Sequence, residues 1–372
     1  MIHVEDQFKV KDMTVRNRLV LPPLTTNYGD ENGHVTPDVL QFYKARSGHV
    51  GLVIVESAAV RPEGRIIPGS IGVWEDGHVP GMAELARTIQ AAGAKAVVQI
   101  NHAGAKAWPF ESMDAWISPS GIACRPGVRA TEAGPDDIAD LVQAFVDAAV
   151  RVKEAGFDGV EIHGAHLYLL SQFLSPLTNL RTDQYGGSVE KRAALPVEIT
   201  AAVREKLGPD YPIFFRLNSL EKLEGGITPD DAVTTGKLLA AAGVDVLDLS
   251  LAANGAWQDD GDQKILATLS AYGKDQVAGD VVELAARFRS ECGLPVMVVG
   301  KLGSLAATRN ALGAGADLVG VGRQMICDPD TAEKILSGRD EDIVECEACQ
   351  ACFACLGKGK PIQCKRNKNL PG

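Results

Sequence analysis

The sequence predicts an α/β protein, a (β/α)8 TIM barrel with a short cysteine-rich C-terminal extension. Three observations support this fold. Short apolar runs alternate with helical patterns eight times, one glycine-centred connector recurs, and no Gly-x-Gly-x-x-Gly motif follows the first strand. Alternating strands and helices are typical of barrels and of doubly wound sheets. The missing glycine fingerprint favours the barrel.

The eight apolar runs are rich in Val, Ile and Leu and are nearly continuous, as parallel strands buried on both faces should be. The expected strands span residues 18–21, 52–56, 96–100, 159–163, 213–217, 246–250, 296–300 and 318–321.

Helical patterns lie between these strands. They span residues 36–47, 80–92, 135–155, 189–207, 230–242, 280–292 and 305–313. Two of them begin with Thr-Pro-Asp, which supplies a threonine cap and a proline at the first helical position. Several end in the recurring connector, whose glycine is expected to take the left-handed conformation that ends a helix. The connectors lie at residues 91–95, 154–158, 241–245 and 313–317.

Composition limits the domain organisation and the partners. The chain has 372 residues, enough for a large core, and we expect one barrel over residues 1–338 and a cysteine-rich tail over residues 339–372. The net charge of −11 argues against nucleic acid or an anionic membrane as the main partner. Neither a signal peptide nor a membrane-length apolar run is evident, so we expect a cytoplasmic protein.

The most informative segment is the strand 159–163 and the loop after it, which carries His163, His166 and Tyr168. Active-site residues of barrels lie at the C-terminal ends of the strands. Two imidazole donors and a phenol at one point can polarise a substrate oxygen and deliver a proton. Two alternatives stay open here: the histidines are structural, or they bind a metal together with Glu161.

Other strand ends suit a bound cofactor. Gln99 and Arg216 end apolar strands, where an amide and a charge need partners. The glycine turns at 300–303 and 322–323 follow the last two strands, the usual place for a phosphate in a barrel. A cofactor with a phosphate at one end and an amide-like ring at the other would use all of these groups. Flavin mononucleotide (FMN) has that shape.

At this point the residues resemble a known family, the Old Yellow Enzyme family of flavin-dependent ene reductases. The resemblance extends over residues 7–336 and includes the long irregular motif Asn179–Ser188. The other matching pieces are Asn17–Leu19, Pro22–Thr25, Val55–Ser57, Gln99, His102–Gly104, His163–Tyr168 and Phe173–Pro176. The chain is also similar to the barrel half of 2,4-dienoyl-CoA reductases, which carry an iron–sulfur cluster after the barrel.

The resemblance implies that FMN is the cofactor and NAD(P)H the electron donor for the reduction of an activated C=C bond. It implies that His163 and His166 hydrogen-bond the substrate oxygen and that Tyr168 protonates the α-carbon. It further implies that Arg216 balances charge on the reduced ring, that Gln99 bonds the pyrimidine edge, and that Thr25 tunes the potential. The residues expected to hold FMN are Pro22, Pro23, Leu24, Thr25, Ser57, Gln99, Arg216, Gly300, Lys301, Gly322 and Arg323.

Five of the eight cysteines crowd into the last 27 residues, a density that indicates metal before disulfides in a reducing compartment. A [4Fe–4S] cluster is one prediction, with zinc and a metal-free tail as alternatives. The eleven-residue gap from Cys352 to Cys364 resembles the spacing of the last two cluster ligands in dienoyl-CoA reductases. In that family, however, three residues separate the second and third cysteines, whereas two separate Cys349 from Cys352 here. The expected ligands are Cys346, Cys349, Cys352 and Cys364, with Cys355 as a rival. The scattered Cys124, Cys292 and Cys327 are expected to be ordinary thiols.

The sequence therefore predicts an FMN-dependent ene reductase that acts on a small unsaturated substrate, and we expect a homo-oligomer. One alternative is a non-catalytic flavin or iron–sulfur protein that exchanges electrons with a partner through the tail. The other is a metal-dependent barrel hydrolase that uses Glu161, His163 and His166.

Overall fold

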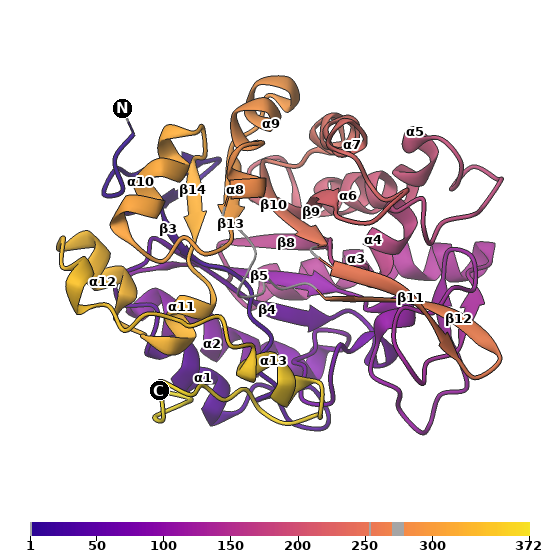
Figure 1. Ribbon diagram of the computed structural model, residues 1–372, viewed down its shortest axis with the longest axis horizontal. Coiled ribbons are helices and arrows are strands. Elements are labelled where there is room, and N and C mark those ends of the chain that lie inside the picture. The colour runs from indigo at the N-terminus through magenta and orange to yellow at the C-terminus, as the bar shows by residue number, and fades with distance from the viewer. Residues whose placement is uncertain (1, 253, 270–278) are drawn as a thin grey trace.

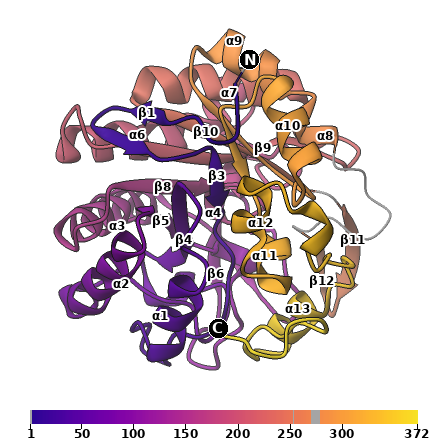
Figure 2. The same cartoon turned by 90° about the vertical axis from the view of Figure 1, so that its left-hand side faces the viewer.

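The computed structural model describes residues 2–252, 254–269 and 279–372. Eight parallel strands close into a barrel in the order β10-β13-β14-β3-β4-β5-β8-β9, with helices around it (Figures 1 and 2). This confirms the predicted TIM barrel. The strands are β3 (Leu19–Leu21), β4 (Leu52–Ala59), β5 (Lys95–Asn101), β8 (Gly159–Gly164), β9 (Ile213–Glu221), β10 (Val246–Ala252), β13 (Val296–Val299) and β14 (Leu318–Gly320).

Most helices lie where the sequence predicts them, but two predicted helices are each divided. The segment 189–207 forms two helices because Pro196 lacks the N–H that would bond the carbonyl of Arg192. The segment 280–292 is interrupted by a tight turn in which Leu284 N donates to Val281 O at 3.2 Å. The helices are α1 (Pro37–Lys44), α2 (Val79–Ala91), α3 (Pro135–Glu154), α4 (Leu169–Leu174), α5 (Val189–Arg192), α6 (Ala194–Leu207), α7 (Pro229–Ala242), α8 (Gly279–Val282), α9 (Ala285–Cys292), α10 (Leu305–Gly313), α11 (Arg323–Cys327), α12 (Thr331–Leu336) and α13 (Ala351–Leu356).

Each predicted connector glycine has a positive φ, as a helix end of this kind requires. The values are +89° at Gly93, +82° at Gly156, +109° at Gly243 and +105° at Gly315. At Gly243 a side chain is also excluded by space, since a Cβ there would lie 2.8 Å from Cγ of Arg204.

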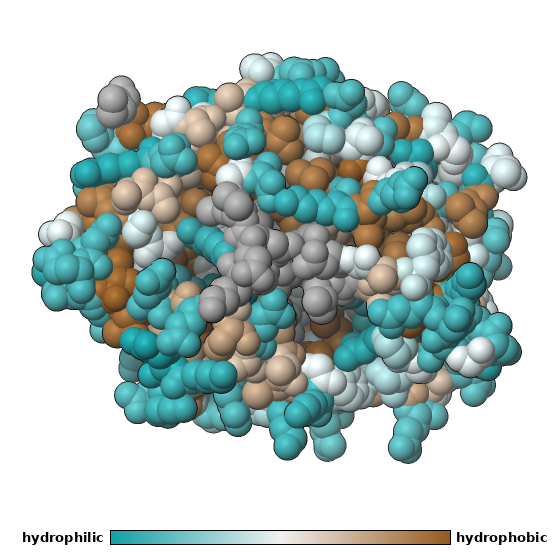
Figure 3. Space-filling model, in the orientation of Figure 1, coloured by the Kyte–Doolittle hydropathy of each residue, from teal (hydrophilic) through white to brown (hydrophobic). Residues whose placement is uncertain are grey.

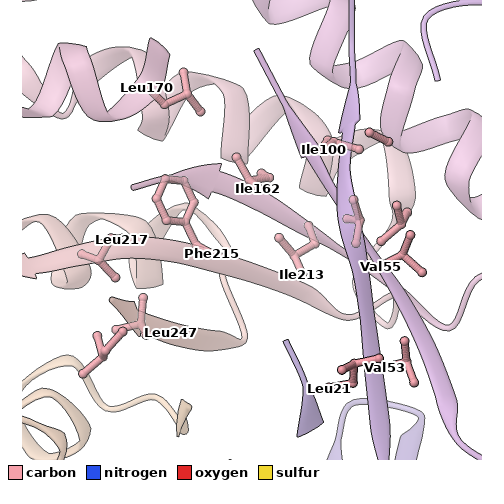
Figure 4. Packing of buried hydrophobic residues seen from close by; sticks show 14 of the residues in the cluster. Leu21, Val53, Val55, Ile100, Ile162, Leu170, Ile213, Phe215, Leu217 and Leu247 are labelled. Carbon is pink, nitrogen blue, oxygen red and sulfur yellow. The ribbon is translucent and has the colours of Figure 1, made fainter. Parts of the chain in front are cut away.

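The core has two layers on opposite sides of the barrel wall, because side chains alternate along each strand. The outer layer packs strands against helices, and Figure 4 shows part of it, with Val55 of β4, Phe215 of β9 and Leu170 of α4. The inner layer includes Leu52 and Phe214 and lies inside the barrel.

Three short two-stranded sheets were not predicted from the sequence. The first is the hairpin of β1 (Phe8–Val10) and β2 (Met13–Val15), whose apolar residues join the inner layer. The others are β6 (Trp116–Ser118) with β7 (Ala130–Glu132), and β11 (Asn254–Asp260) with β12 (Gln263–Leu269). Their strands are too short, or too polar, to show the apolar runs that marked the barrel strands.

The tail after residue 338 follows the outside of the barrel past α11 to α13 (Figure 1). Hydrogen bonds attach it to the barrel on both sides of α13: Cys346 N donates to Gln324 Oε1 at 2.9 Å, and Ile362 N donates to Thr26 O at 3.0 Å. Hydrophilic residues cover most of the face seen in Figure 3, with hydrophobic residues between them. Across the described part of the chain, every helix is too short or too polar to cross a bilayer.

Candidate active site

A cavity of about 1,260 Å³ opens at the C-terminal ends of the barrel strands. It brings together residues from distant parts of the chain, including every residue predicted to contact FMN or substrate. These are Pro22, Pro23, Leu24, Thr25, Ser57, Gln99, His163, His166, Tyr168, Arg216, Gly300, Lys301, Gly322 and Arg323. The cavity also reaches three of the predicted cysteine ligands, Cys346, Cys349 and Cys352. Barrel closure is what gathers them, because it places all strand ends on one rim.

His163 ends β8 and is 2% exposed. Its Nδ1 accepts the N–H of Ala165 at 3.4 Å, so the neutral ring carries its proton on Nε2. Burial and the nearby charge of Arg216 hold the pKa of His163 well below its usual range. His163 is therefore a neutral hydrogen-bond donor at ordinary pH.

His166 lies in a strained turn directly after β8. Its φ is +65° and that of Leu167 is +54°, both in the left-handed region that side chains disfavour. Asn218 holds this turn by accepting the N–H of His166 at 3.1 Å. The Oγ of Ser250 lies 2.7 Å from Nε2 of His166 and orients the ring. Burial and Arg216 hold the pKa of His166 well below its usual range.

Tyr168 completes the group, with its ring centroid 5.1 Å from that of His163 and 6.4 Å from that of His166. Burial raises the pKa of Tyr168 to about 12, so the phenol keeps its proton. Lys106 lies beside it, with Nζ 5.2 Å from the Tyr168 ring centroid and donating to His166 O at 2.7 Å. The arrangement can polarise an oxygen at the histidines and donate a proton from the phenol.

A chain of buried polar side chains lies inside the barrel behind this group. Ser57 donates to Gln99 Oε1, and Gln99 Nε2 donates to Glu161 Oε1 at 2.8 Å. The carboxyl of Glu161 meets that of Asp248, whose Oδ2 lies 3.3 Å from Arg216 Nε. Burial raises the pKa of Asp248 to about 6. Burial, and then the nearby charge of Asp248, raise the pKa of Glu161 well above its usual range. Two carboxyls with one cation favour a shared proton.

These buried side chains argue against one alternative raised by the sequence, the metal-dependent hydrolase. Glu161 points to Gln99 and Asp248, and within the described residues no three His, Cys, Asp or Glu side chains are arranged to hold a metal. Among these residues, the metal-dependent hydrolase therefore lacks the ligand set that it needs.

The opposite end of the cavity suits a phosphate. Gly300 has a φ of +125° and Lys301 one of +54°, which turns the chain sharply after β13. Ser304 caps α10 by accepting the N–H of Ala307 at 3.2 Å. Arg323 lines the cavity, and its buried Nη1 has no hydrogen-bond partner in the described structure. A guanidinium N–H of this kind is a ready donor to a phosphate oxygen, so these residues fit FMN.

The tail cysteines are only partly gathered. Cys364 is not among the cavity-lining residues and lies beside Cys327. Burial, together with the nearby Cys364, raises the pKa of the Cys327 thiol to about 12. Cys349 is exposed, whereas Cys346, Cys352 and Cys364 are half-buried. As they lie, the described thiols do not fit a metal or a cluster.

Sequence reasoning missed several residues at the site. Asn218 and Asp248 alternate with buried apolar residues on β9 and β10, so their inward position could have been read from the strand period. Lys106 and Arg125 follow no strand or helix pattern. Cys327 was expected to be an ordinary thiol, and its place beside Cys364 gives no signal in the sequence.

The motif Asn179–Ser188, the most specific part of the family resemblance, lies outside the cavity. Asn179 Nδ2 donates to Phe173 O and Tyr185 O, both at 2.7 Å, and Arg181 Nη1 donates to Ala133 O at 2.8 Å. These bonds hold the loop after α4, the helix that begins next to Tyr168. The motif therefore supports the site from behind.

The sequence is similar to those of known oxidoreductases. A family described as NADH:flavin oxidoreductase / NADH oxidase matches residues 6–342. The chain is 37% identical over 366 residues to an NADH oxidase from Thermoanaerobacter brockii, a match that covers 96% of this chain and 54% of that protein. It is 37% identical over 325 residues to an NADPH dehydrogenase from Halalkalibacterium halodurans, covering 87% and 90%.

Among solved structures, 2-naphthoyl-CoA reductase in complex with 2-naphthoyl-CoA is similar with a TM-score of 0.89 and 27% identity, covering 99% of this chain and 57% of that one. This chain thus spans little more than half the length of that reductase and of the T. brockii oxidase.

Proposed function

Because the chain belongs to the NADH:flavin oxidoreductase / NADH oxidase family, we propose that it is an FMN-dependent oxidoreductase that reduces activated C=C bonds. Its substrates are α,β-unsaturated carbonyl compounds, and NAD(P)H supplies the electrons. The observation that carries this proposal is one cavity with His163, His166 and Tyr168 at one end and the unpaired Arg323 Nη1 at the other.

Bound FMN would supply hydride chemistry between the nicotinamide and the alkene. The protein's own part begins with binding. Arg323 and the turn at Gly300 and Lys301 would hold the phosphate, and Ser57 and Gln99 would bond the ring edge. Pro22, Pro23, Leu24, Thr25 and Gly322 would line the cofactor's remaining surface. Arg216 would lie near the end of the ring that gains negative charge, and its ion pair with Asp248 fixes its position.

The substrate end would act on the carbonyl compound. Neutral His163 and His166 would donate hydrogen bonds to the carbonyl oxygen, where negative charge develops during attack on the β-carbon. Tyr168 would then donate its proton to the α-carbon. Its raised pKa supports this role, because the phenol keeps the proton until a strong carbon base forms.

A panel of α,β-unsaturated compounds assayed anaerobically with NADH and with NADPH tests the proposal. We expect nicotinamide oxidation that depends on the enone, together with visible flavin absorbance and FMN released in near one-to-one ratio on denaturation. Recovery of FAD, or a flavin-loaded protein that reduces none of the enones, would falsify the assignment.

The tail supports a second proposal, that the chain also exchanges electrons with a separate partner. Three of its cysteines line the same cavity as the predicted flavin site. We propose Cys346, Cys349, Cys352 and Cys364 as ligands of a [4Fe–4S] cluster, with zinc as the alternative. Since the thiols do not yet fit either, the tail would have to rearrange on binding.

Iron, acid-labile sulfide and zinc measured on anaerobically purified protein test the tail. Stoichiometric iron and sulfide would support the cluster and the electron-transfer role, and zinc alone would support a structural metal. Trace amounts of all three would reject both metals and leave a thiol-rich structural tail.

A further inference from the structure

Two cations at the substrate end of the cavity have no part in the proposed reaction. Lys106 and Arg125 both line the cavity near Tyr168. Lys106 is the nearer of the two, with its ammonium held between His166 O at 2.7 Å and the Tyr168 ring at 5.2 Å from the centroid. Arg125 lies close enough to act electrostatically on both Lys106 and Tyr168.

Arg125 is held in place without a counter-charge. Its Nη1 donates to Ile66 O at 2.9 Å, and its guanidinium stacks on the Trp108 ring with the carbon 4.6 Å from the centroid. Within the described residues it has no carboxylate within salt-bridge distance. A guanidinium stacked on an aromatic face and tied by one edge keeps other N–H groups for a ligand.

The surroundings of the two cations are otherwise apolar or neutral. Ile66, Ile67, Pro126 and Ala267 line this end of the cavity, and burial raises the pKa of the Cys124 thiol to about 12, so it is uncharged. Every Asp and Glu among the described cavity-lining residues belongs to the tail segment: Asp340, Glu345 and Glu347. Among the described lining residues, the charged side chains at the substrate end are therefore these two cations.

One buried carboxyl group, Glu221, acts on Lys106 from behind the cavity wall. Its oxygens accept hydrogen bonds from Ser175 at 2.7 Å and Asn218 at 3.3 Å, and it does not line the cavity. Burial lowers the pKa of Lys106 to about 8, and the nearby charge of Arg125 adds to this lowering. The ammonium therefore stays largely protonated at neutral pH. Two like charges in a desolvated pocket are unfavourable, and an anion between them offsets the repulsion.

We propose that Lys106 and Arg125 bind an ionised carboxylate of the substrate, next to the histidines that bind its activating carbonyl. The preferred substrates are then unsaturated carbonyl compounds that also carry a carboxylate. This inference rests on the proposed function, because it uses the same cavity. It adds a selectivity for charge that the histidine–tyrosine group alone does not provide.

Ligand binding to the FMN-loaded protein tests the charge selectivity without turnover. The probes are 4-hydroxybenzoate and 4-hydroxybenzamide, which share a phenol for the histidines and carry para substituents of similar size but different charge. We expect the flavin spectrum to report a Kd at least ten-fold lower for the benzoate. Equal Kd values in the wild-type protein would overturn the inference without requiring any variant.

Three variants assign the selectivity to the two cations. Arg125→Gln and Lys106→Gln should each reduce the benzoate preference several-fold. Arg129→Gln is the matched control, since Arg129 lies four residues along the chain, is exposed, and pairs with exposed Asp262 at 2.9 Å. A preference that survives both Arg125→Gln and Lys106→Gln, or that falls equally in Arg129→Gln, contradicts the assignment.

Turnover separates this inference from the function beneath it. A neutral enone and its carboxylate-bearing counterpart are compared by kcat/KM in the wild type and in Arg125→Gln. We expect the ratio of acid to neutral kcat/KM to fall in the variant, mainly through KM. If the wild type reduces both substrates with equal kcat/KM, only the charge selectivity fails, whereas reduction of neither defeats the proposed function.

Discussion

The two regions that meet at the cavity are organised in opposite ways. On the barrel side, His166 is pinned in a strained turn by Asn218 and oriented by Ser250, and His163 is fixed by Ala165 N–H. On the tail side, residues 339–372 contain a single 3₁₀ turn at Asp340–Asp342 and the six-residue helix α13. The barrel fixes the geometry of its site residues, whereas the described tail does not bring its thiols into a ligand set.

The difference follows from what surrounds each group. The barrel residues lie among buried polar partners that a closed sheet holds at short distances, so their geometry comes from the fold. Hydrogen bonds attach the tail to the barrel up to Cys346 and again from Ile362 onward, and the backbone hydrogen bonds between these two residues are local. A segment of this kind acquires a fixed ligand geometry only when binding energy orders it.

The largest expected effect is on proton donation by Tyr168. Tyr168→Phe should slow alkene reduction by about 10²–10⁴-fold, because it removes the acid and leaves the ring packing. Stopped-flow measurement of the two half-reactions checks this, and flavin reduction by NAD(P)H should be unchanged. Since the pKa of Tyr168 is raised to about 12, the wild-type rate should show no loss from phenol ionisation between pH 6 and 9. Equal slowing of both half-reactions would contradict the acid role.

Removal of the buried cation should be nearly as damaging. Arg216→Met leaves Glu161 and Asp248 without their positive partner, which costs about 3–5 kcal/mol at pH 7 and should release FMN. A carboxyl whose pKa is raised in the folded protein stabilises the fold less as pH rises through that pKa, which is about 6 for Asp248. The difference in folding stability between the variant and the wild type should therefore be smaller at pH 5 than at pH 7. Thermal melting and FMN content at both values measure it, and a difference that grows at pH 5 opposes this account.

The histidine pair should give an intermediate effect. His163→Ala or His166→Ala should lower alkene reduction by about 10²–10³-fold, since each removes one donor to the developing oxyanion. Binding of phenols should weaken in parallel, and flavin content should persist. Ser250→Ala, which only loosens the His166 ring, should cost about 1 kcal/mol in the same assays. Loss of flavin with normal turnover per bound FMN would show that the histidines serve the cofactor instead.

The smallest effect on the barrel is expected from the tail. Cys349→Ser should change barrel stability by less than about 0.5 kcal/mol and leave FMN bound, because the side chain is exposed. If a cluster forms, the same variant should lose iron, whereas Cys355→Ser, the matched control, should keep it. Loss of iron in Cys355→Ser but not in Cys349→Ser would show that Cys355, and not Cys349, is the cluster ligand. A large loss of barrel stability in Cys349→Ser would show that the tail is part of the barrel core.

Much of the fold was readable from local patterns. The eight barrel strands, the connector glycines and the helix starts depend on short-range spacing and backbone preferences, and each appears where the spacing predicts it. The strand ends also revealed the cavity, because parallel strands in a barrel end on one rim. Gln99, His163 and Arg216 were identified in this way. Pro196 likewise predicts the helix break at Ala193, because a proline inside a helical pattern removes one backbone hydrogen bond.

By itself, the sequence determined which side chains reach the rim of the barrel and which family they resemble. Only the tertiary structure decided which of these side chains come together. It places Asp248 next to Glu161 and Arg216, and it brings Lys106 and Arg125 to one end of the cavity. It also places Cys327 beside Cys364. These contacts join residues on different strands and loops. Their distances depend on barrel closure and loop packing, which local periodicity does not encode.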